Sequence, residues 1–359
     1  MILFIEPFYG ASHRALVDGL RERLDLPSAL LSLPPWKWKW RMRAAAPVFH
    51  LTEPALEHEY DVLFASSFLN LAELLGLRPN LRRARKILYF HENQVIYPTL
   101  EDSERDYHYI MTQITSALAA DQVLFNSEFN RSTFLDGIRT FLKRMPKPRP
   151  DTAPDIIAAK SQVFRVPIEA PPASQAWPDS AKAPMILWNH RWEHDKNPED
   201  FFLLIRQLKA SGTPFRLAVI GESYRYAPEV FGQAEKEFAD EIAYWGWRES
   251  REEYWSVLHE SQVVLSTAHQ EFQGLSVMEA VTCACIPLLP KRLVYPEIYP
   301  EEFLYSSPGD ALRKLRAMLA SPEQFDTETL RSNILDDFSW DLWLERYRDI
   351  ICPCPDPIL

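Results

Sequence analysis

Two glutamates, Glu271 and Glu279, lie where a predicted strand gives way to a helix. A carboxylate that accepts hydrogen bonds from neighbouring sugar hydroxyls is a good reader of ribose or of a hexose. Between them, Gly274 lets the backbone approach a ligand. The N–H groups of Gly274, Leu275 and Ser276 open the helix and favour an anion there. The segment predicts a site for a nucleotide diphosphate-sugar, although a plain surface-helix role for Glu279 is the alternative.

Two cations, Arg191 and Lys196, follow a second predicted strand. Both suit a clamp on a diphosphate, because they neutralise the charge that grows on phosphate as a glycosidic bond breaks. Their placement after a strand disfavours the alternative, a pair of ordinary surface cations. The sequence has no Asp-x-Asp motif to hold a divalent metal. We therefore expect protein groups alone to neutralise the phosphates, with no metal and no other cofactor.

A third polar cluster, His91, Glu92 and Asn93, follows a predicted strand of the first half of the chain. His91 is the best candidate to contact the donor sugar and the acceptor hydroxyl. A buried structural histidine is the alternative. Near the amino terminus, Gly10 allows a loop to approach the donor phosphates, and His13 is expected on the acceptor side.

An unusual stretch alternates tryptophans with cations: Trp36, Lys37, Trp38, Lys39, Trp40, Arg41 and Arg43. In an extended segment, this alternation puts the three indoles on one face and the cations on the other. Aromatic platforms beside cations suit unstacked bases and the phosphates of RNA. A partly buried strand with its lysines in water is the alternative, and periodicity alone does not separate the two.

The elements around these residues alternate between apolar strands and amphipathic helices, which predicts parallel sheets built from right-handed crossovers. The pattern runs twice, so we expect an α/β fold of two facing, doubly wound domains with a cleft between them. Ligands in such folds sit at the carboxyl ends of the strands. The predicted parts are a first domain at 1–168, a linker at 169–184, a nucleotide-sugar domain at 185–335, and a crossover helix with a tail at 336–359. The wider stretch 144–184, rich in proline, alanine and aspartate, is expected to be linker-like, and 336–351 to form one aromatic-rich helix.

Composition fits a globular protein, with 47% hydrophobic and 25% charged residues. We find no apolar run of membrane-spanning length. The four cysteines form two Cys-x-Cys pairs without partners for zinc, which favours reduced thiols and a cytoplasmic protein. Residues 1–170 hold 21 Lys and Arg against 20 Asp and Glu, while the remainder holds 18 against 30. This asymmetry favours a polyanion partner for the first domain, although solvated helix ends explain it equally well.

The second half resembles the retaining GT-B glycosyltransferases, the large family that includes sucrose synthase and many mannosyltransferases. Glu271 and Glu279 match the family's Glu-x7-Glu motif, and Arg191 and Lys196 match its Gly-Arg-x4-Lys clamp at the same spacing. A base-flanking loop is matched by Trp247 and Arg248, within Trp-Gly-Trp-Arg. The sequence departs from the family where His190 replaces a glycine and where Phe-Gln precedes Gly274. The resemblance implies transfer with retention of anomeric configuration.

Over nearly its full length the chain also resembles the tRNA-queuosine mannosyltransferases. The similarity is carried by residues 5–13, the Trp/Lys segment, and residues 64–71, 87–94, 97–98 and 124–130. It implies transfer of mannose from GDP-mannose to queuosine at the wobble position of an aspartate tRNA. Neither composition nor spacing indicates the sugar, the base or the acceptor. A GT-B enzyme with another nucleotide-sugar and a lipid, polysaccharide or small-molecule acceptor is the alternative, followed by a non-catalytic nucleotide-sugar binder. The oligomeric state stays open, and no membrane partner is expected.

Overall fold

The computed structural model describes residues 1–96, 106–172, 184–223 and 227–352. The chain divides into two compact units. The first comprises Met1–Pro167 and the segment from Trp340 onward, and the second comprises Ile168–Ser339. Each unit is described by itself.

The first unit is built on a six-stranded parallel sheet in the order β2-β1-β3-β4-β5-β6. Its strands β1 and β3 are buried along their whole length and apolar except for their last residues, Glu6 and Ser66, as expected for a sheet covered on both faces. The strand order reverses direction between β1 and β3, and such a switch point opens a crevice at the carboxyl ends of the strands. The strands are β1 (Ile2–Glu6), β2 (Ser28–Ser32), β3 (Val62–Ser66), β4 (Arg85–Phe90), β5 (Gln122–Phe125) and β6 (Ser161–Val163).

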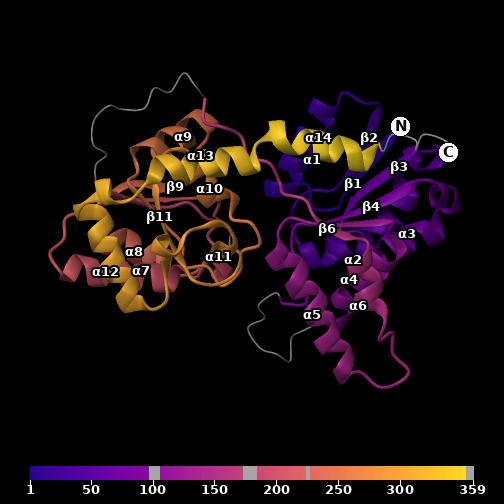
Figure 1. The fold of residues 1–359 in the computed structure, drawn as a ribbon, viewed down its shortest axis with the longest axis horizontal. Coiled ribbons are helices and arrows are strands. Elements are labelled where there is room, and N and C mark those ends of the chain that lie inside the picture. Colours follow the sequence, from indigo (N-terminus) through magenta and orange to yellow (C-terminus); the bar gives the residue numbers. More distant parts are fainter. Residues whose placement is uncertain (97–105, 173–183, 224–226, 353–359) are drawn as a thin grey trace. The chain divides into compact units, whose positions relative to one another are not determined.

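Helices flank this sheet, and the last helix of the described chain packs with the first one (Figure 1). That last helix buries Trp340, Trp343 and Tyr347 in the first unit. The helices are α1 (Ala11–Leu24), α2 (Trp38–Thr52), α3 (Leu71–Leu77), α4 (Tyr107–Ala119), α5 (Glu128–Arg144), α6 (Ala153–Ala159) and α14 (Trp340–Ile351).

The second unit repeats the plan with the order β12-β11-β10-β7-β8-β9. All its strand pairs are parallel, and the order reverses between β7 and β10. Its strands are β7 (Met185–Trp188), β8 (Arg216–Ile220), β9 (Ile242–Gly246), β10 (Val263–Leu265), β11 (Ile286–Pro290) and β12 (Leu304–Tyr305). Its helices are α7 (Pro198–Ala210), α8 (Val230–Glu237), α9 (Arg251–Glu260), α10 (Leu275–Thr282), α11 (Tyr295–Ile298), α12 (Pro308–Ala320) and α13 (Thr327–Phe338).

The predicted α/β class with two doubly wound sheets is confirmed, but three local expectations are wrong. Residues 144–167 are not a linker, because α6 and β6 complete the first unit there. The segment 336–351 is not one helix, since α13 ends at Phe338 and α14 starts at Trp340. The Trp/Lys segment is not extended, because α2 begins at Trp38. Much of the expected 169–184 linker, Tyr97–Pro98 and most of the tail lie outside the described residues.

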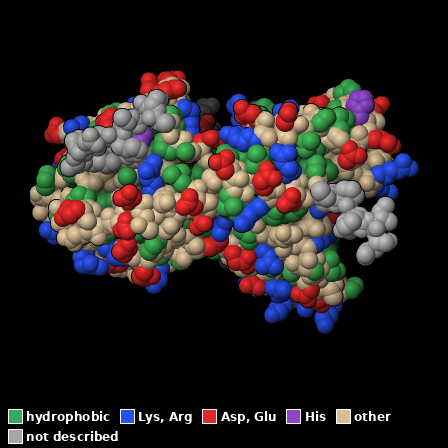
Figure 2. Space-filling model, turned by 45° about the horizontal axis from the view of Figure 1, so that its top comes forward, with side chains coloured by type: hydrophobic (Ala, Val, Ile, Leu, Met, Phe, Trp, Pro, Cys, Tyr) green, Lys and Arg blue, Asp and Glu red, His purple; other side chains and the backbone are tan. Residues whose placement is uncertain are grey.

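Within the described residues, no helix is both long enough and apolar enough to cross a membrane. Cys283 and Cys285 are buried, and neither forms a disulfide bond with a described residue. Figure 2 shows one face of the molecule, on which Lys and Arg side chains are interspersed with Asp and Glu.

Candidate functional site

The carboxyl ends of β7 and β10 bring the predicted donor residues of the second unit together. These two strands are neighbours in the sheet, at the point where the strand order reverses. Arg191 and Lys196 lie in the loop between β7 and α7, and Glu271 lies in the loop between β10 and α10. Lys196 and Glu271 therefore lie together, at the position where open α/β sheets generally bind ligands.

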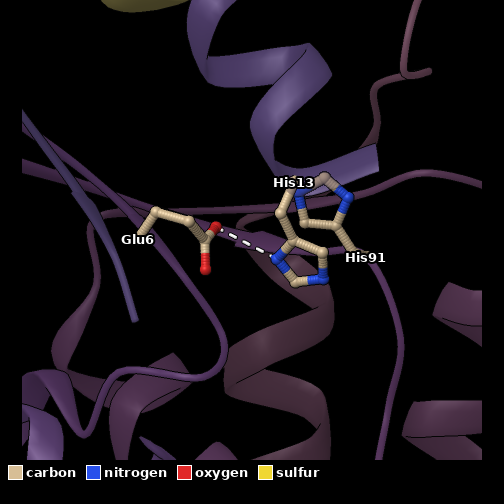
Figure 3. Close-up of side chains that lie close together, drawn as sticks. All are labelled: Glu6, His13 and His91. Carbon is tan, nitrogen blue, oxygen red and sulfur yellow. Dashed lines mark ion pairs between the residues drawn. The ribbon is translucent and has the colours of Figure 1, made fainter. Parts of the chain in front are cut away.

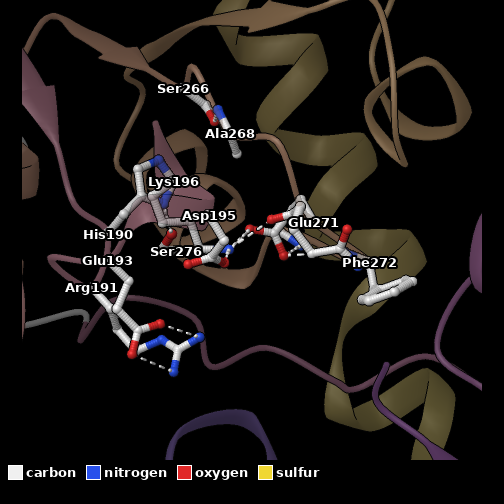
Figure 4. Close-up of polar contacts among 12 residues, drawn as sticks. His190, Arg191, Glu193, Asp195, Lys196, Ser266, Ala268, Glu271, Phe272 and Ser276 are labelled. Atoms are coloured by element: carbon white, nitrogen blue, oxygen red, sulfur yellow. Dashed lines mark hydrogen bonds and ion pairs between the residues drawn. The ribbon is translucent and has the colours of Figure 1, made fainter. Parts of the chain in front are cut away.

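Lys196 is at the centre of this cluster (Figure 4). Its Nζ lies 3.2 Å from Asp195 and 3.3 Å from Glu271, and it donates a 2.8 Å hydrogen bond to the carbonyl of Gln270. Burial lowers the pKa of Lys196, but the two carboxylates outweigh burial and raise it. Burial raises the pKa of Glu271, yet Lys196 brings it below the ordinary value. Lys196 is buried, with 8% of the residue exposed.

Arg191 is more exposed and forms an ion pair with Glu193 (Figure 4). The two guanidinium-to-carboxylate distances are 3.2 and 3.5 Å, so the pairing engages both oxygens. Burial raises the pKa of Glu193, and Arg191 opposes that rise. The carboxylate of Glu193 therefore occupies the fork that a phosphate would take.

Glu271 also shapes the turn that starts α10. Its Oε1 accepts hydrogen bonds from the N–H groups of Phe272 at 3.2 Å and Gly274 at 3.1 Å. Gly274 has a φ of 80°, in the left-handed region that favours glycine. The sequence reasoning took the Gly274 N–H as free for an anion. That expectation is wrong, because Glu271 holds it.

Glu279 faces the neighbouring helix α9. Its carboxylate accepts hydrogen bonds from Arg251 at 3.0 Å and from the Tyr254 hydroxyl at 2.7 Å. Tyr254 lies 3.3 Å from the amide of Asn189, which donates to the carbonyl of Ser276 at 2.7 Å. Burial and the charge of Glu279 raise the pKa of Tyr254 well above its usual range, so this phenol stays a donor. Glu279 is thus oriented by a fixed network, with 18% of its side chain exposed.

His190 fills the position where the resembling family has a glycine. It is buried, and its Nδ1 lies 3.3 Å from the Ser276 hydroxyl at the start of α10. Burial, helped by the charge of Lys196, lowers the pKa of His190 to about 4. The imidazole is therefore neutral at physiological pH and adds no charge to the cluster.

The predicted base-flanking residues lie away from this cluster, after the outermost strand of the same sheet. Trp247 and Arg248 follow β9, an edge strand that is separated from β7 by β8. Trp247 is 60% exposed, and Arg248 donates to the carbonyl of Trp245 at 2.9 Å. Neither Trp247 nor Arg248 contacts Lys196 or Glu271 in the structure.

In the first unit, the carboxyl ends of β1 and β4 bring together His13, His91 and a residue that the sequence did not single out, Glu6 (Figure 3). The Nδ1 of His13 lies 3.0 Å from the Glu6 carboxylate. The rings of His13 and His91 are stacked, with their centroids 3.8 Å apart and an angle of 23° between their planes. Glu92 lies 3.9 Å from the Nε2 of His13.

The loop after β4 is fixed by a buried amide network. Asn93 is fully buried, and its amide donates to the side chain of Asn130 at 2.9 Å. Asn126 donates to the carbonyl of His91 at 2.8 Å. Asn93 thus holds the loop that carries His91 and Glu92 rather than facing a ligand in this structure.

Gly10 caps α1 in an extended conformation, with φ at −163°. A Cβ at this position would lie 2.6 Å from the ring of Pro35. The close approach that Gly10 permits in this structure is therefore that of Pro35.

The Trp/Lys segment forms the start of α2, and its indoles do not share one face. Trp36 and Trp40 are 56% and 61% exposed. Trp38 instead packs against Phe68 and Tyr109, at centroid distances of 6.3 and 5.3 Å. A helical start replaces the expected alternation because residues four apart, not two apart, share a helix face. The surface that we call the α2 patch comprises the exposed residues Trp36, Lys37, Lys39, Trp40 and Arg43 and the half-buried Arg41.

Sequence reasoning missed the residues that support those it named. Glu6, Glu193, Asp195, Arg251 and Tyr254 each pair with a predicted site residue. Glu193 and Asp195 lie inside the predicted clamp segment, so adjacency was an available signal. Arg251 and Tyr254 come from another helix, and only the fold brings them to Glu279.

Known proteins resemble both units. Residues 1–168 match the family model for the N-terminal region of tRNA-queuosine alpha-mannosyltransferase, and residues 172–323 match that of group 1 glycosyl transferases. The tRNA-queuosine alpha-mannosyltransferase of Drosophila melanogaster is 41% identical over 350 residues, covering 95% of this chain and 92% of that protein.

Solved structures share the fold at low identity. Sucrose-phosphate synthase from Thermosynechococcus elongatus superimposes with a TM-score of 0.72 at 13% identity, covering 98% of both chains. Anabaena HepE in complex with UDP and glucose gives 0.68 at 12% identity, covering 98% of this chain and 99% of that one. The predicted GT-B fold is confirmed, and the chain is a glycosyltransferase. It belongs to the tRNA-queuosine alpha-mannosyltransferase family.

Proposed function

We propose that this enzyme transfers mannose from GDP-mannose to queuosine at the wobble position of tRNA(Asp), in the cytoplasm, with retention of anomeric configuration. The observation that carries this proposal is the 41% identity to a tRNA-queuosine alpha-mannosyltransferase over 95% of the chain. That similarity includes the first unit, which is where glycosyltransferases with different acceptors would be expected to differ.

The second unit binds the donor. Arg191 and Lys196 face the diphosphate and stabilise the charge that develops on it. Glu279, presented by Arg251 and Tyr254, accepts hydrogen bonds from the ribose hydroxyls. Glu271 reads the sugar, with Gly274, Leu275 and Ser276 beside it, and Trp247 and Arg248 flank the base.

Protein groups replace a metal in this scheme. The Lys196 ammonium is buried and keeps its proton, and Arg191 carries its charge at every physiological pH. We expect phosphate neutralisation from these two side chains and from amides at the start of α10, so that transfer continues in a chelator.

The first unit binds the acceptor. The α2 patch offers two exposed indoles and a group of cations, which suit bases and phosphates of tRNA. His91 contacts the donor sugar and the attacking hydroxyl, while His13 and Glu92 border the acceptor. Gly10 lets the loop before α1 approach the donor phosphates.

The test is incubation of the protein with bulk tRNA and a panel of nucleotide-sugars in EDTA, followed by mass analysis of the nucleosides. The proposal predicts that a hexose is added to queuosine from GDP-mannose alone. Transfer from another nucleotide-sugar would replace the donor assignment. A requirement for added magnesium or manganese would contradict metal independence.

A further inference from the structure

The carboxylate of Glu6 is held in one orientation at the end of β1. It is 1% exposed, and its Oε1 accepts hydrogen bonds from the N–H of Phe8 at 2.9 Å and from the Ser66 hydroxyl at 2.8 Å. Its Oε2 is left for the Nδ1 of His13, 3.0 Å away. A cationic partner stabilises an ionised carboxylate in such a place, because an unpaired buried charge is costly.

The ring of His13 is equally confined. Phe8 and Phe68 meet it at steep angles, with centroid distances of 5.8 and 5.2 Å. The remaining face carries the ring of His91 at 3.8 Å, as Figure 3 shows. His91 in turn lies 4.6 Å from the ring of Tyr89. Neither imidazole can rotate without displacing an aromatic neighbour.

These three residues invite a metal-site interpretation, because each offers a ligand atom within 4.8 Å of the others. The stacking argues against it. The lone pairs of an imidazole lie in the ring plane, and two nearly parallel rings 3.8 Å apart direct theirs side by side. One ion cannot lie in both planes at the usual distance of about 2.1 Å from each nitrogen.

A division of charge within the pair fits the geometry better. Burial lowers the pKa of His13, but the attraction of Glu6, supported by Glu92, outweighs burial and raises it to about 9. Burial lowers the pKa of His91 well below the ordinary value, and the charge of His13 lowers it further. Glu6, Glu92, Tyr89 and the two histidines are the titratable groups that face one another here.

We propose that Glu6 and His13 are positioning residues for His91: Glu6 holds His13 as a cation, and the stacked cation adds to burial in keeping His91 neutral in a fixed ring orientation. A neutral imidazole accepts a hydrogen bond from a hydroxyl or donates one to it, whereas a cationic imidazole only donates. This inference rests on the proposed function, in which His91 contacts the attacking hydroxyl and the donor sugar. It assigns a positioning part in the reaction to Glu6, which is 1% exposed.

The first experiment follows the charges directly in the full-length protein. Histidine carbon–proton NMR signals are recorded against pH for the wild type and for Glu6→Gln, which keeps the size of the side chain. In the wild type, we expect His13 to titrate near pH 9 and His91 to stay neutral down to well below pH 6.5. In Glu6→Gln, His13 should be neutral at pH 7, and the titration of His91 should move to higher pH because the neighbouring positive charge is gone.

A wild-type His13 that is neutral at pH 7 would overturn the inference, as would an unchanged His91 titration in Glu6→Gln. If Glu6→Gln does not fold, His13→Gln tests the same link. It removes the cation directly, and the pKa of His91 should rise in the same direction.

The second experiment measures kcat/KM for queuosine-containing tRNA against pH. In Glu6→Gln the acidic limb should move to higher pH, while affinity for GDP stays unchanged. Glu59→Gln, which alters an exposed ion pair with Arg83, is the matched control and should leave the profile in place. A uniform loss of activity without a shift of the limb would reduce Glu6 to a structural role. A wild-type enzyme inactive on queuosine-containing tRNA would refute the proposed function, and the NMR result would still decide the pairing.

Discussion

At the scale of single residues, the proposed donor site is a set of charged side chains that already pair with one another. Lys196 lies between Asp195 and Glu271, and Arg191 is paired with Glu193. With His190 neutral, three carboxylates face two cations. In the proposed binding mode, a diphosphate displaces a carboxylate from a cation, and Glu193 is the most exposed of the three carboxylates.

Because only Lys196 is buried between two carboxylates, substitutions of Arg191 and Lys196 should differ in their effect on stability. Arg191→Ala should lower kcat by about 100-fold or more, because it removes charge stabilisation at the diphosphate, and should leave thermal stability nearly unchanged. Lys196→Ala should lower kcat and also cost about 3–5 kcal/mol of stability, since it leaves buried carboxylates unpaired. Arg206→Ala, which breaks a surface pair with Glu237, is the control. Normal turnover in both site variants would refute the clamp.

If Glu193 competes with phosphate for Arg191, substitution of Glu193 should strengthen nucleotide binding rather than weaken it. Glu193→Gln removes the charge that occupies Arg191, so GDP should bind severalfold more tightly by calorimetry. Weaker or unchanged binding would mean that Glu193 orients Arg191 for the ligand rather than competing with it.

Glu279 tests the ribose assignment. Glu279→Gln should weaken GDP binding by roughly 10- to 150-fold, because a charged hydrogen bond of this kind is worth about 1.5–3 kcal/mol. Tyr244 and Glu260 form a comparable tyrosine–glutamate hydrogen bond of 2.8 Å on the surface. Glu260→Gln should leave GDP binding intact. Equal affinities in the two variants would remove Glu279 from the site.

At the scale of elements, the strand ends were predictable and the supporting partners were not. The apolar pattern placed Arg191 and Glu271 after predicted strands, and in the structure these strands, β7 and β10, are neighbours. The short strand β2 was not predicted, because it is only partly buried and its sequence has no strong alternation of apolar and polar residues. The prediction for the Trp/Lys segment was wrong because it took the segment as extended. Trp38 is the first residue of a helix, and its ring packs on Phe68 and Tyr109.

The start of α2 gives an element-scale prediction. Neutralising Lys37, Lys39, Arg41 and Arg43 should raise the KM for tRNA and flatten its log–log salt dependence by about 0.7–0.9 per lost phosphate contact. Trp36→Ala or Trp40→Ala should cost about 1–3 kcal/mol of tRNA binding with little change in that slope. Trp38→Ala should instead lower the thermal stability, because its indole packs inward. If tRNA binding survives all of the surface changes, the α2 patch is structural.

At the scale of the whole molecule, the two units share one arrangement of strands and polar residues. Each unit places polar residues where its strand order reverses or beside that point: Glu6 and His91 in the first unit, Lys196 and Glu271 in the second. The sequence divides charge unequally between its halves, yet one face of the molecule intersperses both signs. Recognition of tRNA is therefore expected from a local patch rather than from a field spread over a whole domain.

The buried histidines make global stability depend on pH. The folded-state pKa of His13 is raised to about 9, so its stabilising effect is complete below about pH 6.5 and is lost as pH rises through 9. The loss is on the order of 3 kcal/mol. His91 and His190 have lowered pKa values, so they destabilise the fold as pH falls below 6.5. Urea unfolding of the wild type should show the alkaline loss, and His13→Gln should abolish that slope.

The central claim is tested most directly with one matched pair of substrates. Purified tRNA(Asp) carrying queuosine at the wobble position and the same tRNA carrying guanosine are each incubated with the protein and GDP-mannose in EDTA. The nucleosides are then separated, and their masses are measured by mass spectrometry. We predict that queuosine gains one hexose and that the guanosine-containing tRNA is unchanged. Absence of the hexose on queuosine, in the presence of active protein that binds GDP, would contradict the account.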